Sequence, residues 1–106
     1  MRQADIFYKG RKAGLLTQND NGSFTFQYDN LWLSDNSTPP ISLTLPKTKE
    51  IYQSNYLFPF FYNMLPEGTN KEVVCKLMRI DRDDYFSLLL ITAQYDTIGA
   101  VTVKKI

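Results

Sequence analysis

Short segments with the hydrophobic pattern of strands occupy the first half of the chain. The clearest is residues 23–28, where Phe24, Phe26 and Tyr28 alternate with polar residues. A period of two places these three aromatic side chains on one buried face of a strand. Three other segments are strand-like, and one of them shows the same alternation. The predicted strands of this half are residues 4–8, 13–17, 23–28 and 41–45.

The segments between these strands are mostly polar. Residues 31–33 are apolar, so we expect them to form a single turn packed on the core. Residues 34–40 contain turn residues and two prolines, which is typical of a surface loop. Pro46 would end the strand over 41–45. Residues 47–53 are then expected to be a polar connection without regular structure.

The most apolar part of the chain follows, and its period is helical. Four apolar residues there occupy positions i, i+3, i+4 and i+7, which form one face of a helix. They are Leu57, Phe60, Phe61 and Met64. Ser54 could cap this helix, but Pro59 would then lie inside it at a cost of roughly 3 kcal/mol. The alternative start is near Phe58 with Pro59 in the first turn, and in both cases Pro66 ends the helix.

Two further helices are predicted in the second half. Thr69 and Glu72 have the spacing of a capping box, which marks the start of the second helix. Its predicted buried stripe is Val73, Val74, Leu77 and Met78. Either Asp83 or Asp84 caps the third helix. The predicted inner face of the third helix is Phe86, Leu89 and Leu90. Residues 98–103 are expected to form a closing strand.

The order of these elements predicts the fold class. Four strands, three helices and one strand indicate an α+β domain, because the two kinds of element are segregated along the chain. We expect a mostly antiparallel sheet of about five strands with about three helices on one face. A chain of 106 residues forms one domain, so residues 1–106 are assigned to it.

Composition and charge exclude several classes of protein. The net charge is +1 with no long run of like charge, so no direct nucleic-acid binding is expected. The single cysteine and the absence of histidine exclude an internal disulfide and a zinc site. No signal peptide or membrane-spanning run is visible, which predicts a cytoplasmic protein that does not bind membranes.

No residue pattern points to catalysis or to a cofactor. Cys75 falls on the polar side of its predicted helix between Lys71 and Arg79, but no histidine is present to act as its base. Asp83 and Asp84 are adjacent carboxylates that a helix N-terminus explains. No glycine-rich phosphate loop or kinase signature occurs. The sequence therefore predicts a protein that is not an enzyme and has no cofactor or metal.

One feature suggests contact with a partner protein. Phe58 and Tyr62 are four residues apart, to one side of the helix face assigned to the core. Two aromatic side chains that the core does not need would form a contact patch. The alternative is that a second layer, the sheet or the turn at 31–33, covers them.

Several motifs resemble the N-terminal subdomain of the HipA family of bacterial toxin kinases. The most specific is residues 60–68, FFYNMLPEG, which is close to the family pattern FFxNLLPDG. Met64 and Glu67 depart from that pattern, and Ala93 replaces an expected glycine. Weaker matches are Gly14-Leu15, residues 24–28, residues 41–46 (family PLSLSLP), residues 84–89 (D-x-F-x-LL) and residues 99–101 (GAV).

The resemblance implies a function that the residues alone do not. The family's kinase core would follow this subdomain, and the chain stops after the closing strand, so kinase activity is not expected. The subdomain then resembles HipS, the small antitoxin of tripartite HipBST-type systems. By this resemblance the chain binds and neutralises a HipT- or HipA-like serine/threonine kinase toxin. A HipB-like DNA-binding protein would be a third member of the complex.

The resemblance also suggests which residues contact the kinase. In such small subunits an aromatic side chain inserts near the kinase active site, and Tyr62 is the first choice for it, Phe61 the second. The expected partner-binding residues are Phe58, Phe61, Tyr62, Pro66, Glu67 and Gly68. The alternative function is that of an orphan or excised subdomain of a HipA kinase with only a structural or interaction role.

Overall fold

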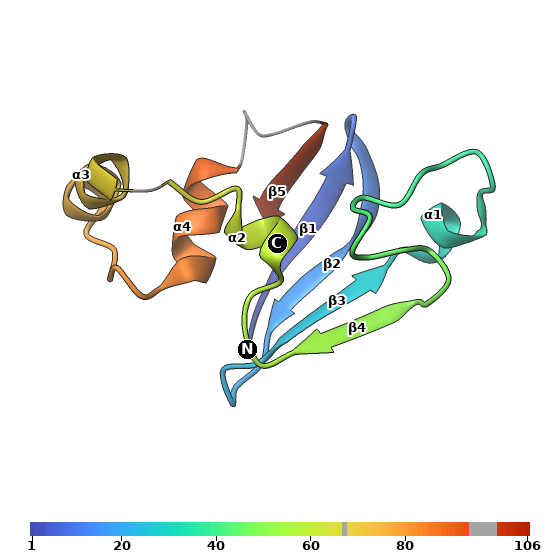
Figure 1. The fold of residues 1–106 in the computed structure, drawn as a ribbon, viewed down its shortest axis with the longest axis horizontal. Coiled ribbons are helices and arrows are strands. Elements are labelled where there is room, and N and C mark those ends of the chain that lie inside the picture. Colours follow the sequence, from blue (N-terminus) through green and yellow to red (C-terminus); the bar gives the residue numbers. More distant parts are fainter. Residues whose placement is uncertain (67, 94–99) are drawn as a thin grey trace.

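The computed structural model describes residues 1–66, 68–93 and 100–106. The strands of the described chain are β1 (Arg2–Tyr8), β2 (Arg11–Gln18), β3 (Phe24–Tyr28), β4 (Ile51–Ser54) and β5 (Val101–Lys105). The helices are α1 (Asn30–Ser34), α2 (Pro59–Tyr62), α3 (Gly68–Met78) and α4 (Tyr85–Thr92). The predicted α+β class and single small domain with an antiparallel sheet are confirmed (Figure 1).

The five strands form one antiparallel sheet in the order β4-β3-β2-β1-β5. The first three strands form a meander, and β5 pairs with β1 so that Ile6 lies opposite Val103. This pairing brings the first and last strands of the chain side by side (Figure 1). Gly14 of β2 lies between Ile6 of β1 and Tyr28 of β3.

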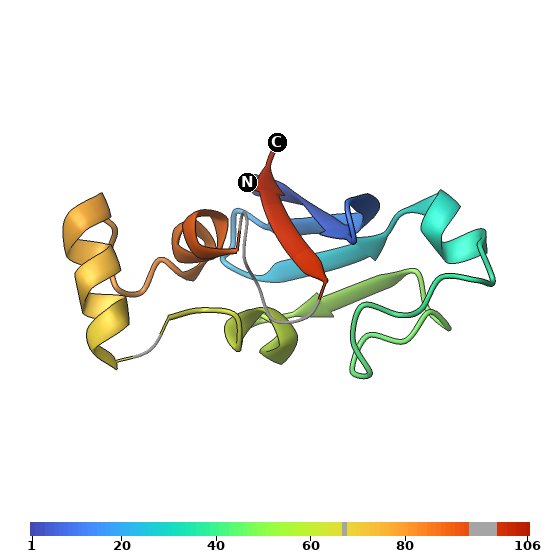
Figure 2. The same ribbon diagram turned by 90° about the horizontal axis from the view of Figure 1, so that it is seen from above.

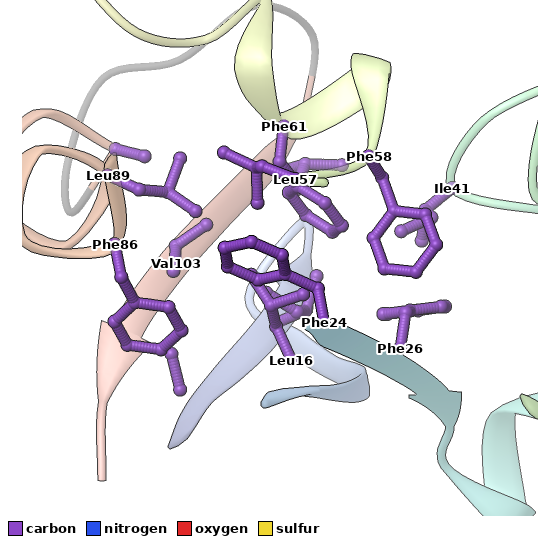
Figure 3. Packing of buried hydrophobic residues seen from close by; sticks show 14 of the residues in the cluster. Leu16, Phe24, Phe26, Ile41, Leu57, Phe58, Phe61, Phe86, Leu89 and Val103 are labelled. Carbon is purple, nitrogen blue, oxygen red and sulfur yellow. The ribbon is translucent and has the colours of Figure 1, made fainter. Parts of the chain in front are cut away.

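One face of the sheet carries the core. Phe24, Phe26 and Tyr28 are buried on it, as their alternation predicts. Phe61 of α2 packs on this face, with its ring centroid 5.9 Å from that of Phe26. The side chains of α4 pack beside β5, where Phe86 and Leu89 lie near Val103 (Figure 3). Helices α2 and α4 therefore cover the sheet, whereas α3 stands beyond α4 and away from it (Figures 1 and 2).

The predicted strand over residues 41–45 is wrong. This segment turns, and its backbone groups are bound by the buried hydroxyl of Tyr28. That hydroxyl donates to the carbonyl of Leu45 and accepts from the amide of Ile41 at 3.2 Å. Burial raises the pKa of Tyr28, and the Ile41 hydrogen bond partly opposes the rise. Leu43, which a strand would bury with its neighbours, is 94% exposed.

The fourth strand lies further along the chain, in the segment predicted to be a polar connection. Residues 51–54 pair with β3 as an edge strand, with Tyr52 opposite Phe26. Two of the four residues of β4, Gln53 and Ser54, are polar, so the sequence of this segment predicts a strand only weakly. An edge strand needs few apolar residues because only part of it is covered.

The helices lie where they were predicted, but the buried face of one of them differs from the prediction. The apolar turn predicted at 31–33 is the short helix α1. Helix α2 begins with Pro59 at its first position, which confirms the later of the two starts, and it is a single turn followed by tighter turns to Leu65. Asp84, not Asp83, caps α4 by accepting from the amide of Ser87 at 3.2 Å. The predicted closing strand at 98–103 is β5 from Val101 onward, and residues 98–99 lie outside the described residues.

The predicted buried stripe of α3 is wrong. Leu77 is 75% exposed, and Val73 and Met78 are also exposed, whereas Cys75 on the supposed polar side is buried. Val74 is half-buried. Because α3 stands at the end of the molecule, only one narrow side of it meets the rest of the domain (Figure 2). The helix itself begins at Gly68, one residue before the predicted cap Thr69.

Candidate partner-binding surface

Two tyrosines from different helices meet at the end of the molecule that carries α3. Tyr62 is the last residue of α2 and Tyr85 the first of α4. Their ring centroids lie 5.5 Å apart with the planes 85° to each other, an edge-to-face contact. Tyr62 remains 47% exposed. An aromatic ring that is held by another ring and still open to solvent is a typical anchor for a protein partner.

Helix α3 adds a cation to this pair. The ammonium of Lys71 lies 5.2 Å from the centroid of the Tyr85 ring, a cation–π contact. Lys71 is one turn into α3, so the contact fixes the start of that helix against α4. Together the three residues form a small surface unit built from α2, α3 and α4.

Cavities lie on both sides of the tyrosine pair. The cavity on the α3 side has a volume of about 300 Å³ and is lined by Tyr62, Leu65, Pro66, Gly68, Lys71, Arg82 and Tyr85. The cavity on the sheet side has a volume of about 380 Å³ and is lined by Gln18, Gly22, Phe24, Asn55, Tyr56, Leu57, Tyr62, Asp83 and Tyr85. We call the two cavities with the tyrosine pair between them the tyrosine groove. It is large enough for several side chains of a partner.

Helix α3, which contributes Lys71 to the groove, also carries exposed apolar residues. Val73 and Leu77 are four residues apart and share one face of the helix, with Met78 beside them. Single exposed apolar residues need no explanation, but an exposed pair on one face with a third on the same short helix is a candidate contact area, which we call the α3 patch. The patch and the tyrosine groove belong to the same end of the molecule.

The predicted partner-binding residues divide into two groups. Tyr62, Pro66 and Gly68 line one cavity together. Phe58 and Phe61 are buried in the core, where their ring centroids lie 6.4 Å apart. Figure 3 shows Phe58 beside Ile41, so part of its cover comes from the loop after α1, whereas the sequence had suggested the sheet or the turn at 31–33. Glu67 lies outside the described residues.

Residues of the groove that the sequence did not indicate come from α3, α4 and the loop after β4. Lys71 and Tyr85 fell in predicted helices without a partner-binding role, and Arg82 fell in the connection between those helices. Tyr56 lay only in the longer version of the first predicted helix. The only available signal was the number of aromatics, 14% of the chain, which is more than a small core needs. Tyr62 and Tyr85, which meet between α2 and α4, are 23 positions apart, so local patterns could not pair them.

A polar network holds α4 in its place on the sheet. The guanidinium of Arg2 in β1 donates to the Asp84 carboxylate at 2.7 Å and to the hydroxyl of Ser87 at 2.8 Å. Arg2 also donates to Gln18 in β2 and lies 5.0 Å from the centroid of Phe86. Burial raises the pKa of Asp84, but hydrogen bonds from Arg2 and Ser87 outweigh burial and lower it overall. The network positions Tyr85, which directly follows Asp84.

The site has the character of a contact surface. Within residues 1–66, 68–93 and 100–106, no cluster of histidine, cysteine or acidic side chains could hold a metal ion. No helix in the described part of the chain is long and apolar enough to cross a membrane. What the arrangement offers is exposed aromatic and aliphatic surface flanked by charges, the composition of a protein interface.

Comparison with known proteins identifies the family. The HipA N-terminal domain model matches residues 4–104. The chain is 33% identical over 89 residues to the putative kinase Y4mE of Sinorhizobium fredii, and it spans 21% of that protein. It is 32% identical over 105 residues to an uncharacterized protein of Haemophilus influenzae, of which it spans 93%.

Comparison with solved structures supports the same family. The structure of an N-terminal domain of HipA toxin superposes with a TM-score of 0.74 at 29% identity, covering 100% of this chain and 93% of that one. HipA of Shewanella oneidensis, in its complex with HipB and operator DNA, matches with a TM-score of 0.76 at 23% identity. That match covers 95% of this chain and 23% of the Shewanella chain, and at such identity it shows the fold alone. The chain therefore belongs to the HipA N-terminal domain family.

Proposed function

We propose that this protein is a HipS-like antitoxin, which binds a HipT- or HipA-like serine/threonine kinase toxin and neutralises it. The observation that carries the proposal is the family match over residues 4–104 together with the Haemophilus relative, of which this chain covers 93%. The chain would act in trans on a kinase, as a subunit without catalysis of its own.

The relatives support an independent subunit. Y4mE, named a putative kinase, contains the domain as about a fifth of its length. The Haemophilus protein is 93% covered by this chain, so in that organism the domain forms nearly a whole protein. A domain that packs within a longer kinase has an interface to the rest of that chain, and a separate copy would present the same interface to a partner.

The tyrosine groove and the α3 patch are the surface that we assign to this interface. Tyr62 is exposed beside two cavities, which suits a side chain that inserts into a partner. Leu77 and its neighbours on α3 offer apolar area that no described part of the domain covers. Docking there would place Tyr62 against the kinase and block its substrate access or its motion. The buried Phe61, the second choice for the inserting residue, would have to leave the core to take that role.

A HipB-like protein fits the same assembly. The Shewanella HipA occurs in a complex with HipB and operator DNA, and its fold includes this domain. We propose that the present protein joins a kinase and a HipB-like DNA-binding protein in the cytoplasm. It would make no direct contact with nucleic acid, since its net charge is only +1.

Co-expression tests this proposal. The protein is produced together with the HipA-type kinase of the same genome, and the mixture is separated by size-exclusion chromatography. We expect the two chains to co-elute. Two chains that elute separately at micromolar concentration would contradict the antitoxin role. Co-elution with full kinase activity would favour the alternative, a structural subdomain without inhibition.

A further inference from the structure

The two sides of the tyrosine groove carry opposite charges. Tyr62 and Tyr85 form the ridge between the cavities and line both of them. On the α3 side the charged lining residues, among those the structure describes, are Lys71 and Arg82. On the sheet side the charged lining residue is Asp83. A segment that crosses the ridge therefore passes from a positive to a negative hollow.

Among the residues that the structure describes, little negative charge offsets the cations of the α3 side. In the described part of the chain Lys71 has no carboxylate within 4 Å, and its ammonium rests on the Tyr85 ring. Arg82 reaches Glu72 at 3.9 Å, but both side chains are more than 60% exposed, so that pair holds the guanidinium weakly. Two cations at the rim of one cavity raise the local positive potential, and they attract an anionic group.

The negative side is also open. No ion pair is formed by the Asp83 carboxylate within the described residues, whereas its neighbour Asp84 is bound by Arg2. Asp83 thus contributes charge to the groove and Asp84 contributes stability to α4. The separation of the two roles leaves Asp83 free to meet a partner.

We propose that the tyrosine groove selects a kinase segment by the order of its charges. This inference rests on the proposed function and names the chemistry of the partner at that site. A carboxylate side chain of the kinase enters the cavity of Lys71 and Arg82, an apolar or aromatic side chain covers the Tyr62–Tyr85 ridge, and a cationic or amide side chain faces Asp83. The charge order fixes the direction in which the segment crosses the domain, since the reverse order places like charges together.

The same pattern disfavours a nucleic-acid strand as the occupant. A phosphate backbone repeats its negative charge along its length, so it gains from the Lys71 and Arg82 side and is repelled at Asp83. A peptide segment can change charge within a few residues. The groove is therefore better matched to a protein partner.

Affinity measurements with the kinase test the inference. Binding of the wild-type protein is compared with that of the double variant Lys71→Glu with Arg82→Glu, and with the neutral pair Lys71→Gln with Arg82→Gln. The double variant Lys104→Glu with Lys105→Glu, at two exposed positions of β5, is the control that matches the acidic double variant in net charge. We expect the acidic double variant to bind at least about tenfold more weakly, the neutral pair to lie between, and the control to bind like wild type. Salt should weaken the wild-type complex more than the complex of the double variant.

The outcomes separate this inference from the function on which it rests. If wild type binds and the acidic double variant binds equally well at low salt, the charge order plays no role and the inference is overturned. The antitoxin proposal would survive that result. If the wild-type protein does not bind the kinase at all, both are overturned. The variants are expected to fold because Lys71 and Arg82 lie at the surface, and thermal melting of each variant checks this.

Discussion

Gly14 is required by packing and not by backbone conformation. A Cβ atom at this position would lie 2.6 Å from the carbonyl oxygen of Gln27 and 2.7 Å from the ring of Phe26. Both neighbours belong to β3, and one of them is backbone, so neither can move without disturbing the strand pairing. Gly14 belongs to one of the motifs that resemble the family. The sequence could not predict its close contact, because that contact depends on where the Phe26 ring lies across the sheet.

The packing at this position gives a prediction for stability. We expect Gly14→Ala to lower the free energy of unfolding by about 1–3 kcal/mol, because the added methyl group overpacks a close strand contact. Urea denaturation followed by Trp32 fluorescence measures the change. Lys12→Ala, in the same strand but at an exposed position, should change the free energy by about 1 kcal/mol or less. An unchanged unfolding midpoint for Gly14→Ala would show that the Phe26 ring is not held where the structure places it.

At the level of elements, α4 followed the sequence and α3 did not. Phe86 and Leu89 are buried as their spacing predicts, because α4 packs directly on the sheet. Leu88 is buried as well, since neighbouring elements enclose the helix on more than one side. In α3 the same kind of pattern predicted Leu77 and Val73 to be buried, but both are exposed. Apolar spacing shows which residues need cover, but not whether the domain or a partner supplies it.

The cap of α4 predicts a pH dependence. Asp84→Ala removes a cap and an ion pair with Arg2, so we expect a loss of about 1–3 kcal/mol at pH 7. The Asp84 pKa is lowered in the folded state from its ordinary value of 3.8. Its stabilising contribution is therefore complete above about pH 4 and is lost as pH falls through the lower folded pKa. Urea denaturation across pH should show the variant and wild type converging at acid pH.

The control for this cap is the neighbouring carboxylate. Asp83 is exposed and forms no ion pair within the described residues, so Asp83→Ala should change stability by about 0.5 kcal/mol or less. A difference between wild type and Asp84→Ala that stays constant down to pH 2.5 would argue against the Arg2 contact as the source of the effect.

At the scale of the whole molecule, the sequence predicted the architecture better than the surface. Strand-like segments in the sequence identified three of the strands before α2, and helical spacing identified the order of the main helices. The alternation at 41–45 predicted a strand, but the segment turns, and its backbone groups form hydrogen bonds with the Tyr28 hydroxyl. Tyr62 was singled out from the sequence, but its pairing with Tyr85 and Lys71 depends on how α2, α3 and α4 meet. Such long-range contacts leave no local pattern.

We propose that this domain inhibits a kinase in trans through the end that carries Tyr62. The most direct measurement is the phosphorylation rate of the HipA-type kinase of the same genome, titrated with the purified protein. We predict that wild type abolishes phosphorylation near stoichiometric amounts and that Tyr62→Ala needs at least about tenfold more protein, the usual scale for an interface anchor. Leu31→Ala, an exposed apolar position at the opposite end, should inhibit like wild type (Figure 1). A kinase that keeps its full rate in excess wild-type protein would contradict the account.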